Sequence, residues 1–308
     1  MILTVTLNTA LDITYRVPAL TPHASHRVSE VRERPGGKGL NVARVLSALG
    51  HESVVTGFAG GPTGAVLREL LAPLAPRDAL VPVAGTTRRT IAVVDDASGD
   101  TTQLNEPGPI VTPEEWATFL TSYDSLLRDA GAVALCGSLP PGIHVGAYAE
   151  LIRRARGAGV PVLLDTSGEP LRRGIAARPD LVKPNADELA QLTGSREPLR
   201  ATRDARRRGA HTVVASLGPD GLLAATADGV WQATPPAPVK GNPTGAGDSA
   251  VAGLLSGLVE QLPWPDLLAR AVALSAATVL APAAGEFDAA AYEDLLPLIA
   301  VTELAAAA

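Results

Sequence analysis

The sequence predicts an α/β protein in which a mostly parallel sheet is covered by helices on both faces, with a small separate β-sheet over one end. From residue 113 onward, apolar segments of strand length alternate with amphipathic segments of helix length, a pattern typical of repeated βα units. Such units form parallel sheets whose faces are both buried under helices. Residues 10–34 and 86–108 carry β patterns without helices. We therefore expect these two stretches to fold together over one end of the main sheet.

The spacing of apolar residues predicts the individual elements. Strands are expected at residues 1–8, 53–57, 132–136, 160–165, 180–183, 212–216 and 221–226, and a β-hairpin at 88–104. Helices are expected from Leu40 to Gly50, from the glycines at 60–64 to about 74, and at 113–128, 145–157, 169–176, 186–193, 198–208, 248–261, 265–281 and 288–300. Only the alanine-rich tail after Glu303 is of low complexity. We expect one domain over residues 1–308, with the small sheet as part of it.

Composition argues against several classes of function. The chain has a formal charge of −6 and only 3% aromatic residues, which disfavours nucleic acid or an anionic membrane as a partner. Its one cysteine, Cys136, excludes an internal disulfide and a cysteine-cluster metal site. The first residues read as a strand rather than a signal peptide, and no apolar run is long enough to span a bilayer. We expect a cytoplasmic protein.

The glycine-rich segment 240–255 is the first candidate site. In Gly245-Ala246-Gly247, backbone N–H groups crowd together, and a helix begins at Asp248. The helix start adds unpaired N–H groups and the positive end of its dipole, so the segment suits a phosphate group. Asp248 fits two roles: a helix cap, or the base that takes a proton from an attacking hydroxyl in phosphoryl transfer. No Lys-Ser/Thr pair follows the glycines, so this is not a Walker A loop.

A second segment suited to anions precedes the first expected helix. In residues 36–41, Gly-Gly-Lys-Gly-Leu-Asn, a glycine turn and Lys38 lie directly before a helix N-terminus. The alternative is a glycine turn that serves packing alone. Only three of the 26 basic residues are lysines, and Lys38 is one of them.

Polar or glycine-rich loops follow several of the expected strands. These loops are Asn8–Asp12, Gly137–Gly142, Asp165–Gly168, Lys183–Glu188 and Ser216–Gly221. Because ligands bind at the carboxyl ends of the strands in such sheets, we expect the loops to converge on one site.

Two segments resemble the signatures of a known family. Residues 36–44, Gly-Gly-Lys-Gly-Leu-Asn-Val-Ala-Arg, and 242–248, Asn-Pro-Thr-Gly-Ala-Gly-Asp, resemble the two signatures of the phosphofructokinase-B branch of ribokinase-like carbohydrate kinases. Three of the loops fall between them in the family's order, and the resemblance runs from Thr4 to about residue 285. It implies a ribokinase-like three-layer sandwich, ATP and Mg²⁺ as cofactors, and a β lid whose closure excludes water.

The resemblance also implies roles for the site residues. Asp248 would accept the proton of the sugar hydroxyl, with the amides of Gly245, Ala246 and Gly247 as the anion hole. The sugar would be held by Asp12, Gly37, Lys38 and Asn41, and its phosphate by Arg88 with Lys38 and Arg27 in support. ATP would contact Lys183, Asn185, Ser216, Gly218 and Gly221, and Mg²⁺ with its waters would be held by Asn185 and Glu188. A sugar phosphate and ATP are the expected partners, and a homodimer would form through the lid.

The segment around Arg88 departs from the family pattern, which reads Thr-Arg-x-Asn-x-Lys. Here residues 87–92 read Thr-Arg-Arg-Thr-Ile-Ala, so the second basic residue is missing. Arg89 would face the other side of the strand. The substrate phosphate is therefore expected to be gripped less tightly, or differently.

Three sugar phosphates fit the resemblance. Gly-Gly-Lys-Gly at 36–39 and Asn-Glu-Pro-Gly-Pro at 105–109 look most like 1-phosphofructokinases and tagatose-6-phosphate kinases. Residues 165–171 and 236–240 also resemble the minor 6-phosphofructokinase. We favour fructose 1-phosphate.

Other functions fit the residues less well. A non-catalytic sugar or nucleotide sensor would have lost the base or the glycine cradle, and this chain keeps both. A nucleoside or ribose kinase would not need Lys38 and Arg88 for a second phosphate. An oxidoreductase of the Rossmann type is excluded because no Gly-x-Gly-x-x-Gly follows the first strand.

Overall fold

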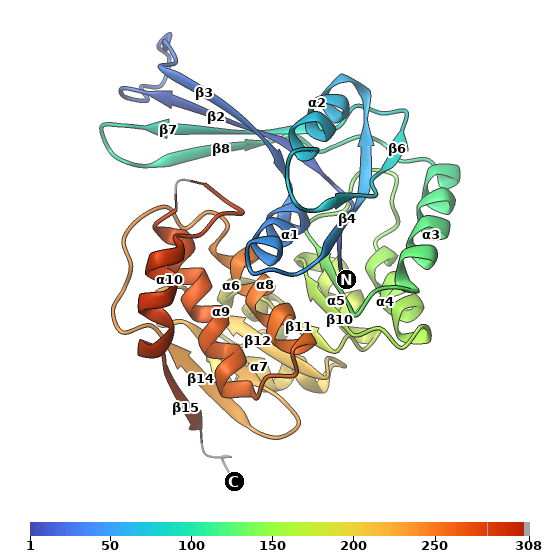
Figure 1. The fold of residues 1–308 in the computed structure, drawn as a ribbon, viewed down its shortest axis with the longest axis vertical. Helices are drawn as coiled ribbons and strands as arrows, with labels where there is room; N and C mark the ends of the chain where they lie inside the picture. The colour runs from blue at the N-terminus through green and yellow to red at the C-terminus, as the bar shows by residue number, and fades with distance from the viewer. Residues whose placement is uncertain (282, 305–308) are drawn as a thin grey trace.

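The computed structural model describes residues 1–281 and 283–304. In it, eleven strands form one large sheet in the order β15-β14-β13-β12-β11-β10-β9-β1-β4-β5, with β6 also paired to β4. The pairs from β5 through β12 are parallel, whereas β12 to β15 pair antiparallel. A second sheet, in the order β3-β2-β7-β8, projects from one end of the molecule (Figure 1).

The elements have the following bounds. The strands are β1 Ile2–Thr6, β2 Ala10–Val17, β3 Glu30–Gly36, β4 Ser53–Gly60, β5 Arg77–Asp78, β6 Val81–Val83, β7 Arg88–Asp95, β8 Thr101–Asn105, β9 Ala132–Cys136, β10 Val162–Asp165, β11 Leu181–Val182, β12 Thr212–Ser216, β13 Leu222–Ala225, β14 Val230–Thr234 and β15 Ala300–Leu304. The helices are α1 Lys38–Ala48, α2 Gly61–Leu71, α3 Pro113–Leu127, α4 Ala147–Gly157, α5 Gly168–Ala176, α6 Ala186–Thr193, α7 Pro198–Arg207, α8 Ala246–Val259, α9 Trp264–Val279 and α10 Ala289–Leu295.

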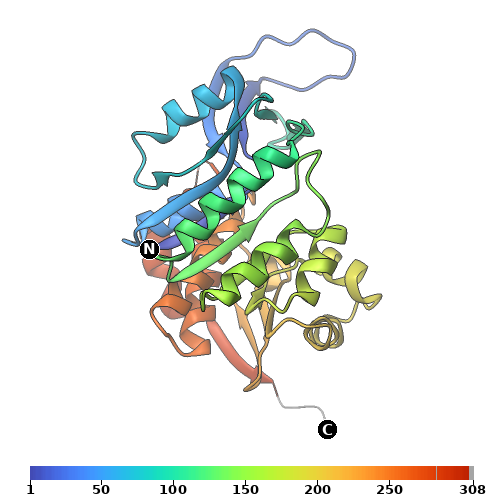
Figure 2. The ribbon, with the colours of Figure 1, turned by 90° about the vertical axis from the view of Figure 1, so that its right-hand side faces the viewer.

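Helices cover both faces of the large sheet, as predicted. In β9, Val133 and Leu135 belong to the core under α3, α4 and α5, whereas Ala132, Ala134 and Cys136 belong to the core under α1, α8 and α9. Both sets are fully buried, which is what a central parallel strand with side chains alternating between faces requires. Figure 2 shows the green helices α3 and α4 on the near face and the orange helices behind the sheet.

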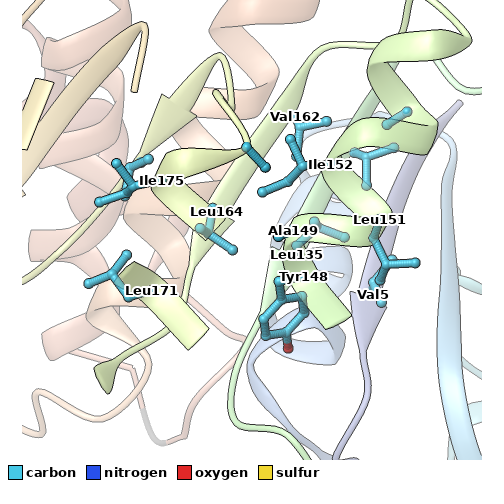
Figure 3. Packing of buried hydrophobic residues seen from close by; sticks show 14 of the residues in the cluster. Val5, Leu135, Tyr148, Ala149, Leu151, Ile152, Val162, Leu164, Leu171 and Ile175 are labelled. Atoms are coloured by element: carbon cyan, nitrogen blue, oxygen red, sulfur yellow. The ribbon is translucent and has the colours of Figure 1, made fainter. Parts of the chain in front are cut away.

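Figure 3 shows the first of these cores from close by. Ile152 of α4 and Leu171 and Ile175 of α5 lie around Leu164 of β10, and each is at most 1% exposed. The hydroxyl of Tyr148 donates to the carbonyl of Cys136 at 2.9 Å, so this buried ring leaves no unpaired polar atom. The packing fixes the carboxyl ends of β9 and β10, from which loops of the candidate site begin.

The smaller sheet is the predicted lid. Strand β2 pairs antiparallel with β3 and parallel with β7, so Asp12 lies between Arg34 and Thr90. The face that carries Asp12 is mostly polar and lines a cleft. The opposite face carries apolar side chains, of which Val31 and Leu104 are 56% and 58% exposed.

The C-terminal part differs from the prediction. The helix expected over 288–300 ends at Leu295, and a short 3₁₀ turn and the edge strand β15 follow it. Pro297 lies in that turn, and a proline inside an apolar pattern ends a helix because it lacks the N–H group and clashes with the preceding turn. Strands β5, β6 and β14 have no predicted counterpart; β5 and β6, of two and three residues, are too short to show alternation. The alanine-rich tail at 305–308 lies outside the described residues.

Candidate active site

The glycine turn before α8 is shaped as the sequence predicts. Gly245 has a φ of 87°, and a Cβ at this position would lie 2.7 Å from the backbone of the loop after α9, so only glycine fits. The Ala246 amide donates to the Pro243 carbonyl at 3.1 Å and is used within the turn. Among the described residues, the amides of Gly245, Gly247 and Asp248 have no acceptor. The free N–H groups therefore belong to Gly245, Gly247 and Asp248. The amide of Ala246, which was predicted to be one of them, is not free.

Asp248 lies in the first turn of α8 and is 7% exposed. It accepts a hydrogen bond from Asn41 Nδ2 at 2.9 Å and, within the described chain, none from the amides of its own helix. The helix-cap alternative is therefore wrong. Burial raises the pKa of Asp248 to about 6, while nearby Lys38 acts in the opposite direction. A carboxylate of this basicity beside unpaired N–H groups can take a proton from a hydroxyl near neutral pH.

Asp165, at the end of β10, holds two lysines. Its carboxylate is 1% exposed, and its oxygens lie 3.2 Å from Lys38 Nζ and 3.5 Å from Lys183 Nζ. Burial alone would raise the pKa of Asp165, but the two ammonium groups hold it below its ordinary value. A Cβ at Gly247 would lie 3.6 Å from Lys183 Nζ, so that ammonium group lies beside the glycine turn. Asp165 thus places one cation at the start of α1 and the other beside the free amides.

Asp12 and Asn41 lie where the lid meets α1. A Cβ at Gly36 would overlap the Asp12 carboxyl group, 2.1 Å from its Cγ, so the glycine makes room for this carboxylate. Burial raises the pKa of Asp12 to about 6, against the opposing charge of Arg88. Asp12 and Asn41 line a cleft of about 970 Å³ between the polar face of the lid and the loop before α8. Gly37, with a φ of 111°, forms the turn into α1.

Arg88 begins β7 at the base of the lid. Its guanidinium donates to the carbonyls of Asn8 and Glu106 at 3.2 and 3.3 Å, and it lines a second hollow of about 560 Å³ together with Ser138. Arg89 faces the other side of the strand, as predicted, and is paired with Glu106. Ala92 lines the large cleft. The basic residue missing from the family pattern is therefore missing from the cleft itself.

Asn185 and Glu188 cap the helix α6. The Asn185 side chain accepts from the Glu188 amide at 2.8 Å, and the Glu188 carboxylate accepts from the Asn185 amide at 2.9 Å. Asn185 also forms a β-bridge with Ser216, so the segments predicted for the metal and the nucleotide are adjacent. Gly218 and Gly221 have φ values of 62° and 84°, in the left-handed region that favours glycine, so this turn depends on both glycines.

Arg27 is the predicted site residue that the structure places elsewhere. It is exposed in the loop between β2 and β3 and does not line the cleft. The other two predicted cations, Arg88 and Lys38, lie at the start of β7 and at the start of α1.

Three residues of the site were missed by sequence reasoning. Asp165 ends an expected strand, but its bonds to the lysines join positions 127 and 18 residues apart along the chain. Ser138 accepts from Asn8 Nδ2 at 3.1 Å, a contact between two loops that were each recognised only as polar. Glu286 joins the lid to α1 through Arg34 and Arg44. The carboxyl end of a strand pointed to Asp165; no pattern pointed to Glu286.

Comparison with known proteins agrees with this geometry. The model of the pfkB family carbohydrate kinases matches residues 5–290. The chain belongs to this family. Membership and the solved neighbours make it an ATP-dependent sugar-phosphate kinase and confirm the ribokinase-like fold with its smaller sheet. Within the described residues, no helix has the length and apolar character needed to cross a membrane.

Three solved structures show how close the likeness is. Phosphofructokinase-2 from Escherichia coli in a tetrameric inhibited form is 29% identical, with a TM-score of 0.87 over 96% of this chain and 98% of that one. The same enzyme in complex with fructose-6-phosphate is 30% identical, with a TM-score of 0.87 over 96% and 98%. A protein described as a "possible 1-phosphofructokinase" from Thermotoga maritima is 28% identical, with a TM-score of 0.86 over 99% and 100%.

Proposed function

We propose that this pfkB-family kinase transfers a phosphoryl group from ATP to fructose 1-phosphate and forms fructose 1,6-bisphosphate. The observation that carries the proposal is the buried Asp248 carboxylate beside unpaired amides, hydrogen-bonded to Asn41, which lines the same cleft as Asp12. A base and an anion hole at one point are what phosphoryl transfer to a hydroxyl needs.

In the reaction, Asp248 acts as the base. Its carboxylate takes the proton of the sugar hydroxyl, whose oxygen forms a bond to the γ-phosphorus while the bond from that phosphorus to the ADP oxygen breaks. Asn41 orients the carboxylate through its 2.9 Å hydrogen bond. The amides of Gly245 and Gly247 stabilise the charge on the transferred group, and Lys183 adds a positive charge beside them.

The residues near α6 fit ATP and Mg²⁺. The described residues contain no group of three or more acidic, histidine or cysteine side chains that could hold a metal alone. Mg²⁺ commonly keeps several waters and uses one or two carboxylates together with substrate phosphates, and Glu188 with Asn185 would supply that part. When bound, the ion neutralises charge on the phosphates. Ser216, Gly218 and Gly221 would contact the nucleotide along a turn whose two glycines take left-handed φ values.

The sugar phosphate would bind at the base of the lid. Asp12 and Asn41 would hold the sugar hydroxyls, with Gly37 providing the turn, and Arg88 would bind the phosphate together with Lys38. Ser138 lines the same hollow as Arg88 and adds a hydroxyl donor. A guanidinium group suits this task because it can make two hydrogen bonds to one phosphate.

A homodimer through the lid is part of the proposal. The outer face of the lid carries Val31 and Leu104, both more than half exposed, and a sheet face of this kind is usually covered by a partner. Covering it with a second copy would also bring Arg27, which is exposed on the lid, near another protomer.

An assay of ADP release with several sugars tests the proposal. Fructose 1-phosphate, fructose 6-phosphate, tagatose 6-phosphate and the unphosphorylated sugars would be compared at equal ATP. We expect the highest kcat/KM with fructose 1-phosphate. Preference for fructose 6-phosphate, which is bound in one neighbouring structure, would change the substrate but not the reaction class. ADP release that no sugar phosphate stimulates would contradict the proposal as a whole.

A further inference from the structure

The loop after α9 carries one carboxylate that joins the lid to the catalytic helices. Glu286 Oε1 accepts from Arg34 Nη1 at 2.7 Å and from Arg44 Nη2 at 2.8 Å. Arg34 belongs to β3 of the lid and is the register partner of Asp12. Arg44 belongs to α1, the helix that also carries Asn41. We call Glu286, Arg34 and Arg44 the Glu286 bridge.

The same loop packs against the groups that hold the base. Arg44 Nη1 also donates to the carbonyl of Ala284 at 3.2 Å. A Cβ at Gly245 would lie 2.7 Å from Ala284 Cα, and a Cβ at Gly285 would lie 3.0 Å from Asn41 Oδ1. The loop therefore lies between the glycine turn and Asn41, whose amide holds Asp248. A shift of the Glu286 bridge would be passed on to both.

We propose that Glu286 is a positioning residue that couples the place of the lid to the geometry of the base and the anion hole. One oxygen of its carboxylate is shared by a guanidinium on the lid and a guanidinium on α1. When Asp12 on β2 engages a sugar, the neighbouring strand β3 is held against the loop that supports Gly245 and Asn41. The inference rests on the proposed role of Asp248 as the base.

A merely stabilising ion pair is the competing explanation. Glu286 is 35% exposed and Arg34 is 27% exposed, and ion pairs with this much solvent contact contribute little to stability. Positioning has a different signature. Small misplacements of reacting groups can cost a large factor in rate, and a loosened lid admits water to ATP.

The test uses the full-length enzyme with Glu286→Gln, Arg34→Gln and the double variant. Gln keeps the length of Glu but removes the charge that both guanidinium groups share. We expect Glu286→Gln to lower kcat/KM for the sugar phosphate roughly tenfold. We also expect more ADP released per sugar phosphorylated, with the KM for ATP and the unfolding temperature little changed. The double variant should be about as impaired as the worse single variant, because both changes break one coupling.

Glu169→Gln is the matched control. Glu169 also bridges two arginines, Arg172 and Arg173, but on α5, and within the described chain it has no ion pair or hydrogen bond to the lid. It should leave kcat/KM and the ratio of ADP to product unchanged. The inference is overturned if Glu286→Gln keeps the wild-type kcat/KM and the wild-type ratio of ADP to product. It is also overturned if the effects of Glu286→Gln and Arg34→Gln simply add, or if the loss of activity only follows a loss of folded protein. A wild-type enzyme inactive on every sugar phosphate would instead refute the proposed function.

Discussion

The glycine turn at α8 and the lid sheet differ in how firmly their polar groups are held. At the turn, Asp248 is buried, bonded to Asn41 and backed by the loop after α9. In the lid, Arg88 shares its guanidinium with two carbonyls at 3.2 and 3.3 Å, and Ala92 leaves part of the cleft without a charge. The turn packs closely against the loop after α9, whereas the lid has one face against the cleft and one exposed.

From this difference we expect residues of the turn to determine the chemical step and residues of the lid to determine which substrate binds. A base and an anion hole must be placed accurately to lower the barrier, so they belong on a helix start packed in the core of the protein. Groups that recognise the distal phosphate can vary on a surface sheet without disturbing that core. Changes at the turn should therefore affect turnover for every substrate, and changes in the lid should affect one class of substrate.

The largest effect is expected from Asp248→Asn. The amide keeps the shape and the neighbour Asn41 but cannot accept the proton, and loss of a general base typically costs roughly 10²–10⁴ in rate. Turnover should fall by this factor, while ATP affinity, measured by equilibrium titration, stays within a few-fold. Near-normal turnover would show that Asp248 serves only the structure of α8.

Arg88→Ala should come next. A charge-assisted hydrogen bond contributes about 1.5–3 kcal/mol, so kcat/KM for the sugar phosphate should fall roughly ten- to a hundredfold. The KM for ATP should stay nearly unchanged. Arg89→Ala is the matched control, because Arg89 is paired with Glu106 on the other face of the strand and should cost less than about twofold. Equal losses for ATP and sugar would place Arg88 in the nucleotide site or in the structure of the lid.

The pH dependence of kcat should show the basicity of Asp248. Its pKa is raised to about 6 by burial, and the proposed base can accept a proton only when it is deprotonated. Activity should therefore be full above that value and fall about tenfold per unit as the pH drops below it. Because the pKa of Asp12 is also raised to about 6, the profile should be repeated with Asp12→Asn. If this variant lost the acidic limb of kcat, Asp12 and not Asp248 would be its cause.

Much of the fold could be predicted because its signals are local. The helices over 113–128 and 186–193 begin at Thr112 and Asn185, each followed three residues later by a glutamate, and both form capping boxes in the structure. The alternation of strand and helix then determined the parallel sheet. The last strand, β15, could not be predicted, because the apolar residues of Ala300–Leu304 fit a helix as well as a strand. Only its pairing with β14 fixes this segment as a strand.

The candidate site was predictable where one loop builds it. Gly245 and Asp248 lie three residues apart, so the turn and its base were visible in the sequence. The bridge from Glu286 to Arg34 joins residues 252 positions apart, and that from Lys38 to Asp165 joins residues 127 apart. Such contacts depend on the tertiary fold, and a single sequence contains no pattern that reports them.

The smallest effect is expected from Ala92→Lys, which would supply the basic residue that the family pattern has at this position. Ala92 lies in the middle of β7, between Thr14 of β2 and Gln103 of β8, and lines the cleft beside Asp12 and Thr90. A lysine there would extend over the polar face of the lid, where its charge is partly screened by solvent. We expect the KM for the sugar phosphate to fall a few-fold, on the scale of about 0.5–1 kcal/mol for a partly exposed charge pair. The KM for unphosphorylated fructose should not change, which separates a gain at the phosphate from a general change in lid closure. Equal decreases in KM for both sugars would mean that the lysine acts on the lid. An unchanged KM would mean that a phosphate held at Arg88 and Ser138 lies beyond the reach of a side chain at position 92.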